Sequence, residues 1–398
     1  MYNAGGNVEE VQPMKIKFPI SISLGIATCV LATAAAICQA QPSASLANSA
    51  SVDEPARPAA SGTADRPTRG IQPKQLAKLT LDVDQMAESN DGVVRLSDVI
   101  YGRKFGMALT MDVLRPSQPN GAAVVWAVSG GFYSSHDQMS GPGFVKYVVA
   151  LVERGYTVFA VVHGSNPKFD MREVSTDMHR AVRFIRHNAR ALRIDPNRIG
   201  ISGASAGGSI ALWLGTRGGP GDANAKDPVD RASSQVQAVA CFYPGVDWVH
   251  WEKDGSNNLA TSRRLGLIDA FRFRDFDPVK KEYVEETDPN KINAILAEYS
   301  PINHVSAQSA PTLILQGDKD ALVRLEVVTA MIDKLKRAGV PAQLVVKEGK
   351  GHSWPGQDQD IKLFADWYDK YLLGVAAAGA ISSAPTTGQA PANTPEAR

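Results

Sequence analysis

The pentapeptide Gly-Ala-Ser-Ala-Gly at residues 203–207 constrains the fold of this chain more than any other segment. Residues 198–202, before it, form a short apolar run typical of a buried strand, and residues 206–216, after it, have the composition of a helix. A serine at such a strand-to-helix turn adopts a strained backbone conformation that only small neighbours permit, which explains the glycines on both sides. The turn would expose the Ser205 hydroxyl beside the N-terminal amides of the helix, although an ordinary tight turn could have the same sequence.

Two loops further along the chain carry the side chains that a nucleophilic serine needs. The apolar run at residues 311–316 is followed by Gly-Asp-Lys-Asp, which contains Asp318 and Asp320. The strand-like run at residues 341–347 is followed by a glycine-flanked loop that contains His352. A carboxylate just beyond a strand can orient an imidazole, and the imidazole can take the proton of the serine. The order along the chain is then serine, acid, histidine, with solvated turn residues as the alternative interpretation of both aspartates.

A glycine pair after an earlier strand is a candidate source of amide donors for an oxyanion. Residues 122–128 are apolar and strand-like, and they lead into Ser-Gly-Gly-Phe-Tyr at residues 129–133. In a serine-based site one donor is the amide of the residue after the nucleophile, here Ala206, and another comes from a loop of this kind. We predict that Gly130 and Gly131 line this oxyanion hole, with Gly131 favoured. A plain glycine turn is the alternative interpretation.

Taken together, these segments resemble an α/β-hydrolase of the esterase and lipase type, in the group that includes hormone-sensitive-lipase-like and bacterial feruloyl-esterase-like enzymes. The resemblance runs from about Val94 to Leu373. Besides the two loops after the strands, it is carried by residues 128–132, 177–190, 194–208 and 300–305. It implies a mostly parallel sheet of about eight strands with helices on both faces, and hydrolysis of carboxylic esters through an acyl-serine.

The resemblance also assigns roles to single residues. The family's acid is the aspartate three residues after the glycine of the acid loop, which is Asp320 here, with Asp318 as the alternative. The implied catalytic triad is Ser205, Asp320 and His352. The segment at residues 129–133 resembles the family's His-Gly-Gly-Gly signature, with serine in place of the histidine and phenylalanine in place of the third glycine.

Composition is compatible with a large soluble enzyme. The chain has 398 residues, of which 44% are hydrophobic and 21% charged, and its formal net charge is +1. This balance gives no electrostatic indication of nucleic-acid binding. The sequence contains no His-Glu-x-x-His pair, no cluster of thiolates and no dinucleotide or phosphate loop, so we expect neither a metal nor an organic cofactor.

The N-terminal segment has the pattern of an export signal. Residues 1–40 indicate a secretory signal peptide in which Met14 is the true start, followed by a basic stretch, an apolar middle and cleavage near Ala40. The alternatives are an uncleaved membrane anchor and a lipid anchor on Cys38, whose preceding residue fits poorly. The pattern predicts a periplasmic or extracellular protein without stable membrane insertion after cleavage.

The rest of the chain divides by composition. Residues 41–75 and 375–398 are rich in Ala, Ser, Pro and Thr and are predicted to be a disordered linker and a disordered tail. Residues 76–374 are the predicted catalytic domain, with a cap insertion at about residues 245–299. Cys241 is the one cysteine expected in the mature chain and reads as a small buried apolar residue.

Aromatic residues in and near the cap insertion are candidates for substrate contact. A long insertion between two strands can cover a site and supply aromatic walls, although its aromatic residues could equally serve to pack it onto the body. Phe132, Tyr133 and Trp248 are the predicted contacts. His136 and His163 fall near the expected mouth of the site.

The sequence therefore predicts an exported carboxylesterase, a serine hydrolase acting on small-molecule or polysaccharide-linked esters such as acetyl or feruloyl esters. One alternative is a serine peptidase similar to prolyl oligopeptidase, although the chain has no room for that family's N-terminal propeller. Another is a non-catalytic binding protein on the same fold, against which the complete triad argues. The sequence does not determine the oligomeric state or the acyl preference.

Overall fold

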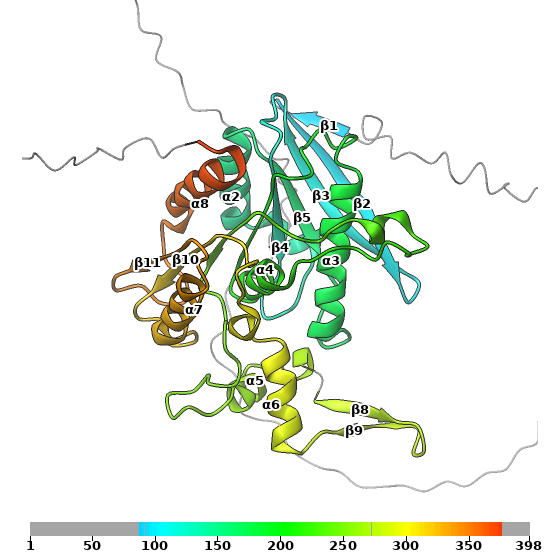
Figure 1. The fold of residues 1–398 in the computed structure, drawn as a ribbon, viewed down its shortest axis with the longest axis vertical. Helices are drawn as coiled ribbons and strands as arrows, with labels where there is room; N and C mark the ends of the chain where they lie inside the picture. Colours follow the sequence, from blue (N-terminus) through cyan, green and yellow to red (C-terminus); the bar gives the residue numbers. More distant parts are fainter. Residues whose placement is uncertain (1–86, 91, 272, 376–398) are drawn as a thin grey trace, which may run out of the picture. The chain divides into compact units, whose positions relative to one another are not determined.

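Apolar strand runs that alternate with helical stretches form one sheet with helices on both faces (Figure 1). The computed structural model describes residues 87–90, 92–271 and 273–375, all within one compact unit, Leu81–Arg398. The predicted signal peptide and linker, and all of the predicted tail except Val375, lie outside the described residues. Among the residues that are described, no helix has the length and apolar character needed to cross a membrane.

The sheet has nine strands in the order β1-β2-β3-β5-β4-β6-β7-β10-β11. Their bounds are β1 Ala87–Asn90, β2 Val93–Lys104, β3 Met107–Pro116, β4 Ala123–Val128, β5 Thr157–Val162, β6 Ile199–Ala204, β7 Ala238–Phe242, β10 Thr312–Gly317 and β11 Ala342–Lys347. Neighbouring strands pair in parallel among β5, β4, β6, β7, β10 and β11. Strands β1, β2 and β3 add an antiparallel edge. The predicted mostly parallel α/β-hydrolase sheet is confirmed, and the short β1 is the strand beyond the expected number.

The central strands are apolar along their whole length because both faces of the sheet are covered. Every residue of β4, β7 and β10 is buried. A strand with one face in water would alternate apolar and polar residues instead. This continuous burial is why the strand runs could be recognised in the sequence.

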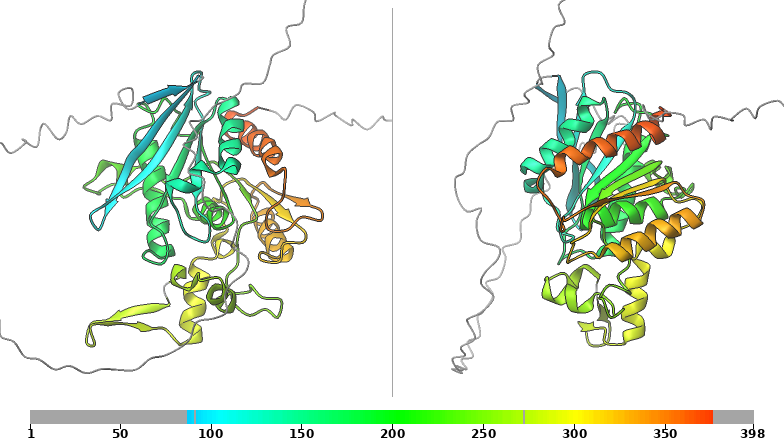
Figure 2. Two further views of the ribbon diagram at one scale, coloured as in Figure 1. Left: turned by 180° about the vertical axis from the view of Figure 1, so that it is seen from behind. Right: turned by 90° about the vertical axis from the view of Figure 1, so that its left-hand side faces the viewer.

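Helices cover both faces of the sheet (Figure 2). Helices α3 Met171–His187, α4 Ala206–Arg217 and α7 Leu325–Arg337 pack into one hydrophobic core. Helices α2 Pro142–Glu153 and α8 Ile361–Tyr368 pack into the other. The short helical turns are η1 His136–Ser140, η2 Pro228–Arg231, η4 Pro301–His304, η5 Gln357–Asp360 and the π-helical η6 Asp369–Leu373.

Helix α3 shows how the sequence fixes the ends of an element. Asp170 caps its N-terminus by accepting the amides of the second and third helical residues, and the Glu173 side chain accepts the Asp170 amide in return. Val174, Met178 and Ile185 lie on the buried stripe that faces the sheet. The cap and the stripe together fix the position of α3, which matters for the loops described below.

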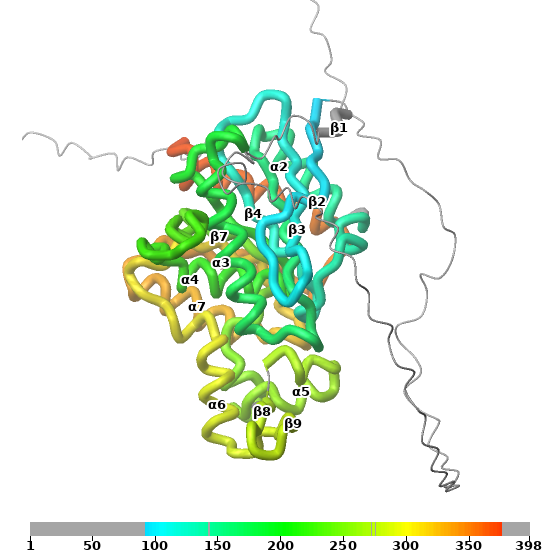
Figure 3. The backbone as a smooth tube through the Cα atoms, turned by 90° about the vertical axis from the view of Figure 1, so that its right-hand side faces the viewer, coloured from blue at the N-terminus to red at the C-terminus, as the bar shows by residue number. Residues whose placement is uncertain are grey.

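The chain between β7 and β10 folds into a separate group of small elements beside the ends of the strands (Figures 1 and 3). They are α5 Leu259–Arg264, η3 Ile268–Phe271, β8 Arg274–Asp277, β9 Glu282–Glu285 and α6 Pro289–Glu298. All of them fall within the insertion predicted at residues 245–299. Strands β8 and β9 form an antiparallel hairpin. We call this group the cap.

Candidate active site

Ser205 lies in a strained turn between β6 and α4. Its backbone has φ 54° and ψ −121°, a region that non-glycine residues rarely adopt. A Cβ on Gly203 would lie 2.3 Å from the carbonyl carbon of Gly207, and a Cβ on Gly207 would lie 2.5 Å from the Ala127 oxygen. No side chain fits at either position, so the glycines that the sequence singled out are required by close backbone contacts.

The three residues of the predicted triad form one hydrogen-bonded chain. Ser205 Oγ lies 2.8 Å from His352 Nε2, and His352 Nδ1 lies 2.9 Å from Asp320 Oδ2. Asp320 follows the end of β10 and His352 follows β11, so parallel strands deliver both side chains to the same edge of the sheet as Ser205. Asp318 instead pairs with Lys319 Nζ at 3.3 Å. The geometry therefore matches the assignment of Asp320 over Asp318.

The surroundings of Asp320 keep its carboxyl ionised. Burial acts to raise the pKa of Asp320, but the hydrogen bond and charge of His352 and the amides of Val323 and Leu322 hold that pKa below its ordinary value. The amides lie 2.9 and 2.8 Å from Oδ1, and Gln316 Nε2 lies 2.9 Å from Oδ2. An ionised carboxylate only accepts hydrogen bonds, so His352 Nδ1 carries the proton. His352 Nε2 is then free to accept the Ser205 hydroxyl proton.

The predicted amide donors do not all remain available. The Gly130 amide donates to the Tyr133 backbone oxygen at 2.9 Å, so it is already hydrogen-bonded within its own loop. The prediction that Gly130 is an oxyanion donor is therefore wrong. The amides of Gly131, Phe132 and Ala206 have no backbone acceptor within the described part of the chain. Of the predicted residues, the structure thus leaves Gly131 and Ala206 with free amides beside Ser205, and it adds Phe132.

A narrow pocket of about 50 Å³ opens at Ser205 under the cap. It is lined by Gly131, Phe132, Ser205, Ala206, Ser209, Gly245, Trp248, Trp251, Asn258, Thr261, Ser262, Leu265, Leu267, Phe271, Leu322 and Val323. The predicted contacts Phe132 and Trp248 are in this wall, with their rings 5.9 Å apart in an edge-to-face arrangement. Tyr133 is not in the wall, and its side chain is 52% exposed. The loop turns at Phe132, which has φ 61°, so consecutive aromatic residues end in different environments.

Several residues that support the site were not identified from the sequence. The Tyr243 ring lies 4.5 Å from the His352 ring, and the Tyr243 hydroxyl bonds to Gln357. Ser209 Oγ donates a hydrogen bond to the backbone carbonyl oxygen of Ser205 and accepts one from the Gly245 amide. Ser209 lies on α4, four residues after Ser205 at the N-cap, and this spacing is the signal that could have identified it.

His136 lies outside the pocket wall and has partners of its own. Its Nε2 is 2.8 Å from Thr110 Oγ1. Donor atoms of Asp98, Asp112 and His136 all lie within 4.8 Å of one another, the spacing that a metal ion would need. However, Asp112 is already neutralised by Arg95, whose Nη2 lies 2.6 Å from it. The cluster is therefore explained by pairing within the protein.

We call residues 129–133 the glycine loop. His163 is buried near this loop and does not line the pocket. Its Nδ1 bonds to the Gly164 oxygen at 2.7 Å, and its amide donates to Ser134 Oγ. Burial lowers the pKa of His163 from 6.5 to about 4. The neutral ring therefore donates from Nδ1, and His163 is placed to support the loop rather than to contact substrate.

The lowered pKa of His163 predicts a loss of stability in acid. Between pH 6.5 and about 4 the unfolded chain takes up a proton that the folded chain refuses, so stability is complete above this range and falls as the pH decreases through it. The full effect is about 3 kcal/mol. In His163→Asn, the free energy of unfolding measured in urea should fall less over this range than in the parent. The exposed His187→Asn should match the parent, and equal slopes for His163→Asn would contradict the prediction.

The fold, the strained serine turn and the hydrogen-bonded chain of Ser205, His352 and Asp320 together define an α/β-hydrolase with a site of the serine-esterase type. The chain belongs to the BD-FAE family, which it matches over residues 111–335.

Several curated relatives are named as esterases, and their identity to this chain is low. The chain is 24% identical over 285 residues to the probable carboxylic ester hydrolase LipM of Mycobacterium tuberculosis, covering 71% of this chain and 58% of that protein. It is 26% identical over 268 residues to the ethyl acetate hydrolase of Pseudomonas putida, covering 65% of this chain and 75% of that protein. The chain spans 58%, 53% and 59% of the lengths of LipM, LipQ and LipC of Mycobacterium tuberculosis.

Solved structures share the fold. A truncated carbohydrate esterase from gut microbiota superposes with a TM-score of 0.59 at 21% identity, covering 72% of this chain and 99% of that one. An acetyl ester-xyloside bifunctional hydrolase from Caldicellulosiruptor lactoaceticus superposes with a TM-score of 0.54 at 22% identity, covering 69% and 96%. At these identities the likeness shows a common fold.

Proposed function

We propose that this protein is an exported serine hydrolase that cleaves carboxylic esters through an acyl-serine intermediate. The observation that carries the proposal is the hydrogen-bonded chain from Ser205 through His352 to Asp320 at the mouth of a pocket with free amides. The family and the esterase names of the curated relatives support the same chemistry. No metal or cofactor is needed for it.

The proposed mechanism uses each of these groups in turn. His352 Nε2 takes the proton of Ser205 as Oγ attacks the ester carbonyl, and Asp320 stabilises the imidazolium that forms. The amides of Ala206 and of the glycine loop stabilise the oxyanion, aided by the N-terminus of α4. His352 then protonates the leaving alcohol. A water deprotonated by His352 hydrolyses the acyl-serine and restores the site.

We propose a short acyl group for this pocket. The pocket is small, about 50 Å³, which is a few times the space that one water molecule needs. Acetyl to butyryl chains match that space, whereas a feruloyl group does not. Among esters carried by polysaccharides, this favours acetyl over feruloyl. The relatives named for ethyl acetate and carbohydrate esters support small esters of this class.

Activity against p-nitrophenyl acetate, butyrate and octanoate tests the function and the pocket together. We expect kcat/KM to be highest for acetate or butyrate and at least about 10-fold lower for octanoate, because a chain too long for the pocket displaces the ester carbonyl from Ser205. Leu267 lines the pocket and is only partly buried, so Leu267→Ala should raise octanoate turnover relative to acetate. Leu363→Ala, on the outer side of α8, is the matched control.

Two results would contradict this account. Octanoate as the best substrate of the parent would contradict the pocket size. Hydrolysis of aminoacyl p-nitroanilides without hydrolysis of any ester would indicate a peptidase instead.

We also propose that the protein is exported to the periplasm or the exterior of the cell. The support is the sequence of residues 1–40, with a basic start, an apolar middle and a small residue before the cut. N-terminal sequencing of the purified natural protein tests this, since cleavage near Ala40 removes the preceding residues. A retained segment would favour the membrane-anchor alternative.

A further inference from the structure

The loop that follows β5 is bonded to the glycine loop beside Ser205. The Asn166 amide donates to the Phe132 oxygen at 3.1 Å, and Asn166 Nδ2 donates to the Gly131 oxygen at 3.3 Å. One residue therefore binds two consecutive carbonyls of the glycine loop. Gly131 has φ 57° and Phe132 has φ 61°. A phenylalanine in this region is strained and persists only where its surroundings enforce the conformation.

These hydrogen bonds determine the direction of the Phe132 amide. In a trans peptide the carbonyl and the following amide point in opposite directions. The Gly131 oxygen points to Asn166, which is not in the pocket wall, whereas Gly131 and Phe132 are in it. The Phe132 amide therefore points away from Asn166, and Phe132 itself lines the pocket. Since the Gly130 amide is already bonded to Tyr133, Phe132 is the candidate for the donor that the sequence assigned to Gly130.

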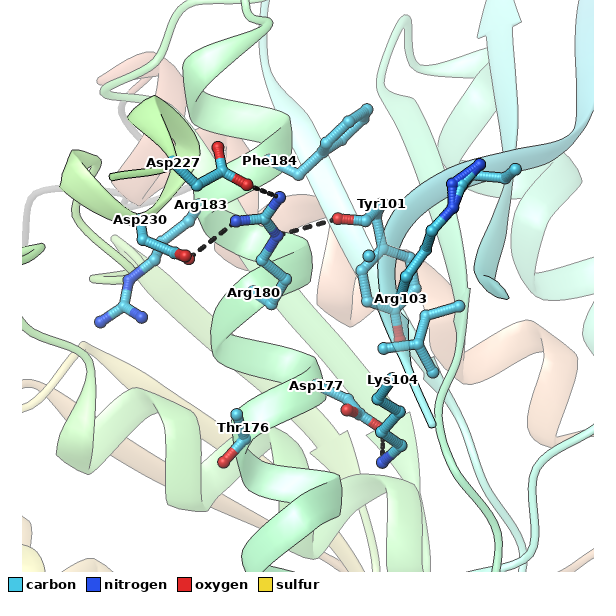
Figure 4. A pocket seen from close by; sticks show the side chains of 13 residues that line it. Tyr101, Arg103, Lys104, Thr176, Asp177, Arg180, Arg183, Phe184, Asp227 and Asp230 are labelled. Atoms are coloured by element: carbon cyan, nitrogen blue, oxygen red, sulfur yellow. Dashed lines mark hydrogen bonds and ion pairs between the residues drawn. The ribbon is translucent and has the colours of Figure 1, made fainter. Parts of the chain in front are cut away.

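The loop that carries Asn166 is itself anchored to α3. The Gly164 amide donates to Asp177 Oδ2 at 2.9 Å, and Lys104 Nζ donates to the same oxygen at 2.6 Å. Figure 4 shows this pair of Lys104 and Asp177, which joins the end of β2 to α3 at one side of a separate surface pocket. Ser165 Oγ also accepts the Ser134 amide at 2.8 Å. These hydrogen bonds hold the loop that carries Asn166 in place, so Asn166 can in turn hold the glycine loop in a defined position.

We propose that Asn166 is a positioning residue for the oxyanion hole. Its side chain holds the Gly131 carbonyl so that the Phe132 amide can donate to the oxyanion in the transition state. The inference rests on the proposed ester hydrolysis at Ser205. It assigns to the loop after β5 a role in catalysis that does not require contact with the substrate.

Asn166→Ala and Asn166→Asp test this role. Because a misplaced donor acts on the transition state more than on the bound substrate, Asn166→Ala should lower kcat for p-nitrophenyl acetate by about 10- to 100-fold and change KM by less than about 3-fold. The rate at which a p-nitrophenyl phosphonate labels Ser205 should fall by a similar factor, since its phosphoryl oxygen occupies the oxyanion position. Asn188→Ala removes a comparable amide-to-carbonyl bond, to Phe184, and should leave kcat unchanged.

The aspartate variant adds a readout that a structural role would not alter. An ionised carboxylate cannot donate to the Gly131 oxygen, but a protonated carboxyl can. The ratio of the Asn166→Asp rate to the parent rate should therefore rise as the pH falls through the titration range of that carboxyl. A merely structural defect would give a ratio that does not change with pH.

The outcomes separate this inference from the proposed function. A parent that reacts with ester and phosphonate, together with an Asn166→Ala variant of unchanged kcat and labelling rate, would overturn the inference alone. A rise in KM with unchanged kcat would also overturn it. A parent that neither hydrolyses esters nor is labelled would overturn the proposed function and the inference with it.

Discussion

Replacing Ser205 with alanine is expected to lower kcat for p-nitrophenyl acetate by about five to six orders of magnitude. The reason is that Ser205 Oγ is the atom that would attack the carbonyl, and it is the hydroxyl bonded to His352 Nε2 at 2.8 Å. Alanine also relieves no packing strain, since the turn is fixed by the glycines on both sides. The measurement is steady-state release of p-nitrophenol, corrected for the background rate without protein.

A second serine provides the matched control. Ser353 is exposed and follows His352 directly, so Ser353→Ala removes a hydroxyl near the site without touching the hydrogen-bonded chain. Its kcat should stay within about 2-fold of the parent, the range expected of a surface substitution. Equal residual activity in Ser205→Ala and the parent would mean that Ser205 is not the nucleophile.

Asp320→Asn should lower kcat by about 10⁴-fold while Asp318→Asn changes it by only a few-fold. An amide at position 320 can donate to His352 Nδ1, which favours the ring tautomer with its proton on Nε2. That tautomer cannot accept the Ser205 proton. Asp318 bonds to Lys319 and not to the imidazole, so its replacement leaves the tautomer unchanged. Rates with p-nitrophenyl acetate across the pH range compare the two variants directly.

The pair of variants also separates catalysis from stability. Asp320 accepts hydrogen bonds from two amides and from Gln316, so urea unfolding of both variants should accompany the kinetics. A folded Asp320→Asn with the activity of the parent, or an inactive Asp318→Asn, would reverse the assignment of the acid.

The serine turn and the order of the triad could be predicted because they depend on local sequence. Gly203 and Gly207 lie so close to backbone atoms that only glycine fits at these positions. This requirement can be recognised directly in the sequence. Asp320 and His352 follow buried strands, whose continuous apolar runs are easily recognised. The choice between Asp318 and Asp320 came from the family resemblance, since both residues fit the same turn chemistry.

The glycine loop could not be predicted in the same detail, because the direction of a backbone amide depends on tertiary contacts. Gly130 and Gly131 were predicted because they match the paired glycines of the His-Gly-Gly-Gly signature, whose backbone amides donate to the oxyanion. In the structure the Gly130 amide bonds within its loop, and Phe132, whose oxygen accepts the amide of Asn166 from a different loop, has a positive φ. Contacts between loops that are distant in the sequence leave no periodic signal.

The partners of the triad illustrate the same limit. Tyr243 lies against the His352 ring, yet in the sequence it is only the residue that follows a buried strand. Gln316 is buried at the end of β10, and its amide bonds to Asp320. Each of them supports the site through a side chain whose direction is set by the sheet rather than by a local motif.

The most direct test of the account is the site at which a p-nitrophenyl phosphonate modifies the protein. The reagent mimics the tetrahedral intermediate and stays attached to the nucleophile. Peptide mass spectrometry of the labelled parent should find one modification, on Ser205, with loss of esterase activity in proportion to labelling and no labelling of Ser205→Ala. Modification of a different residue, or full esterase activity in a parent that is stoichiometrically labelled at Ser205, would contradict the account.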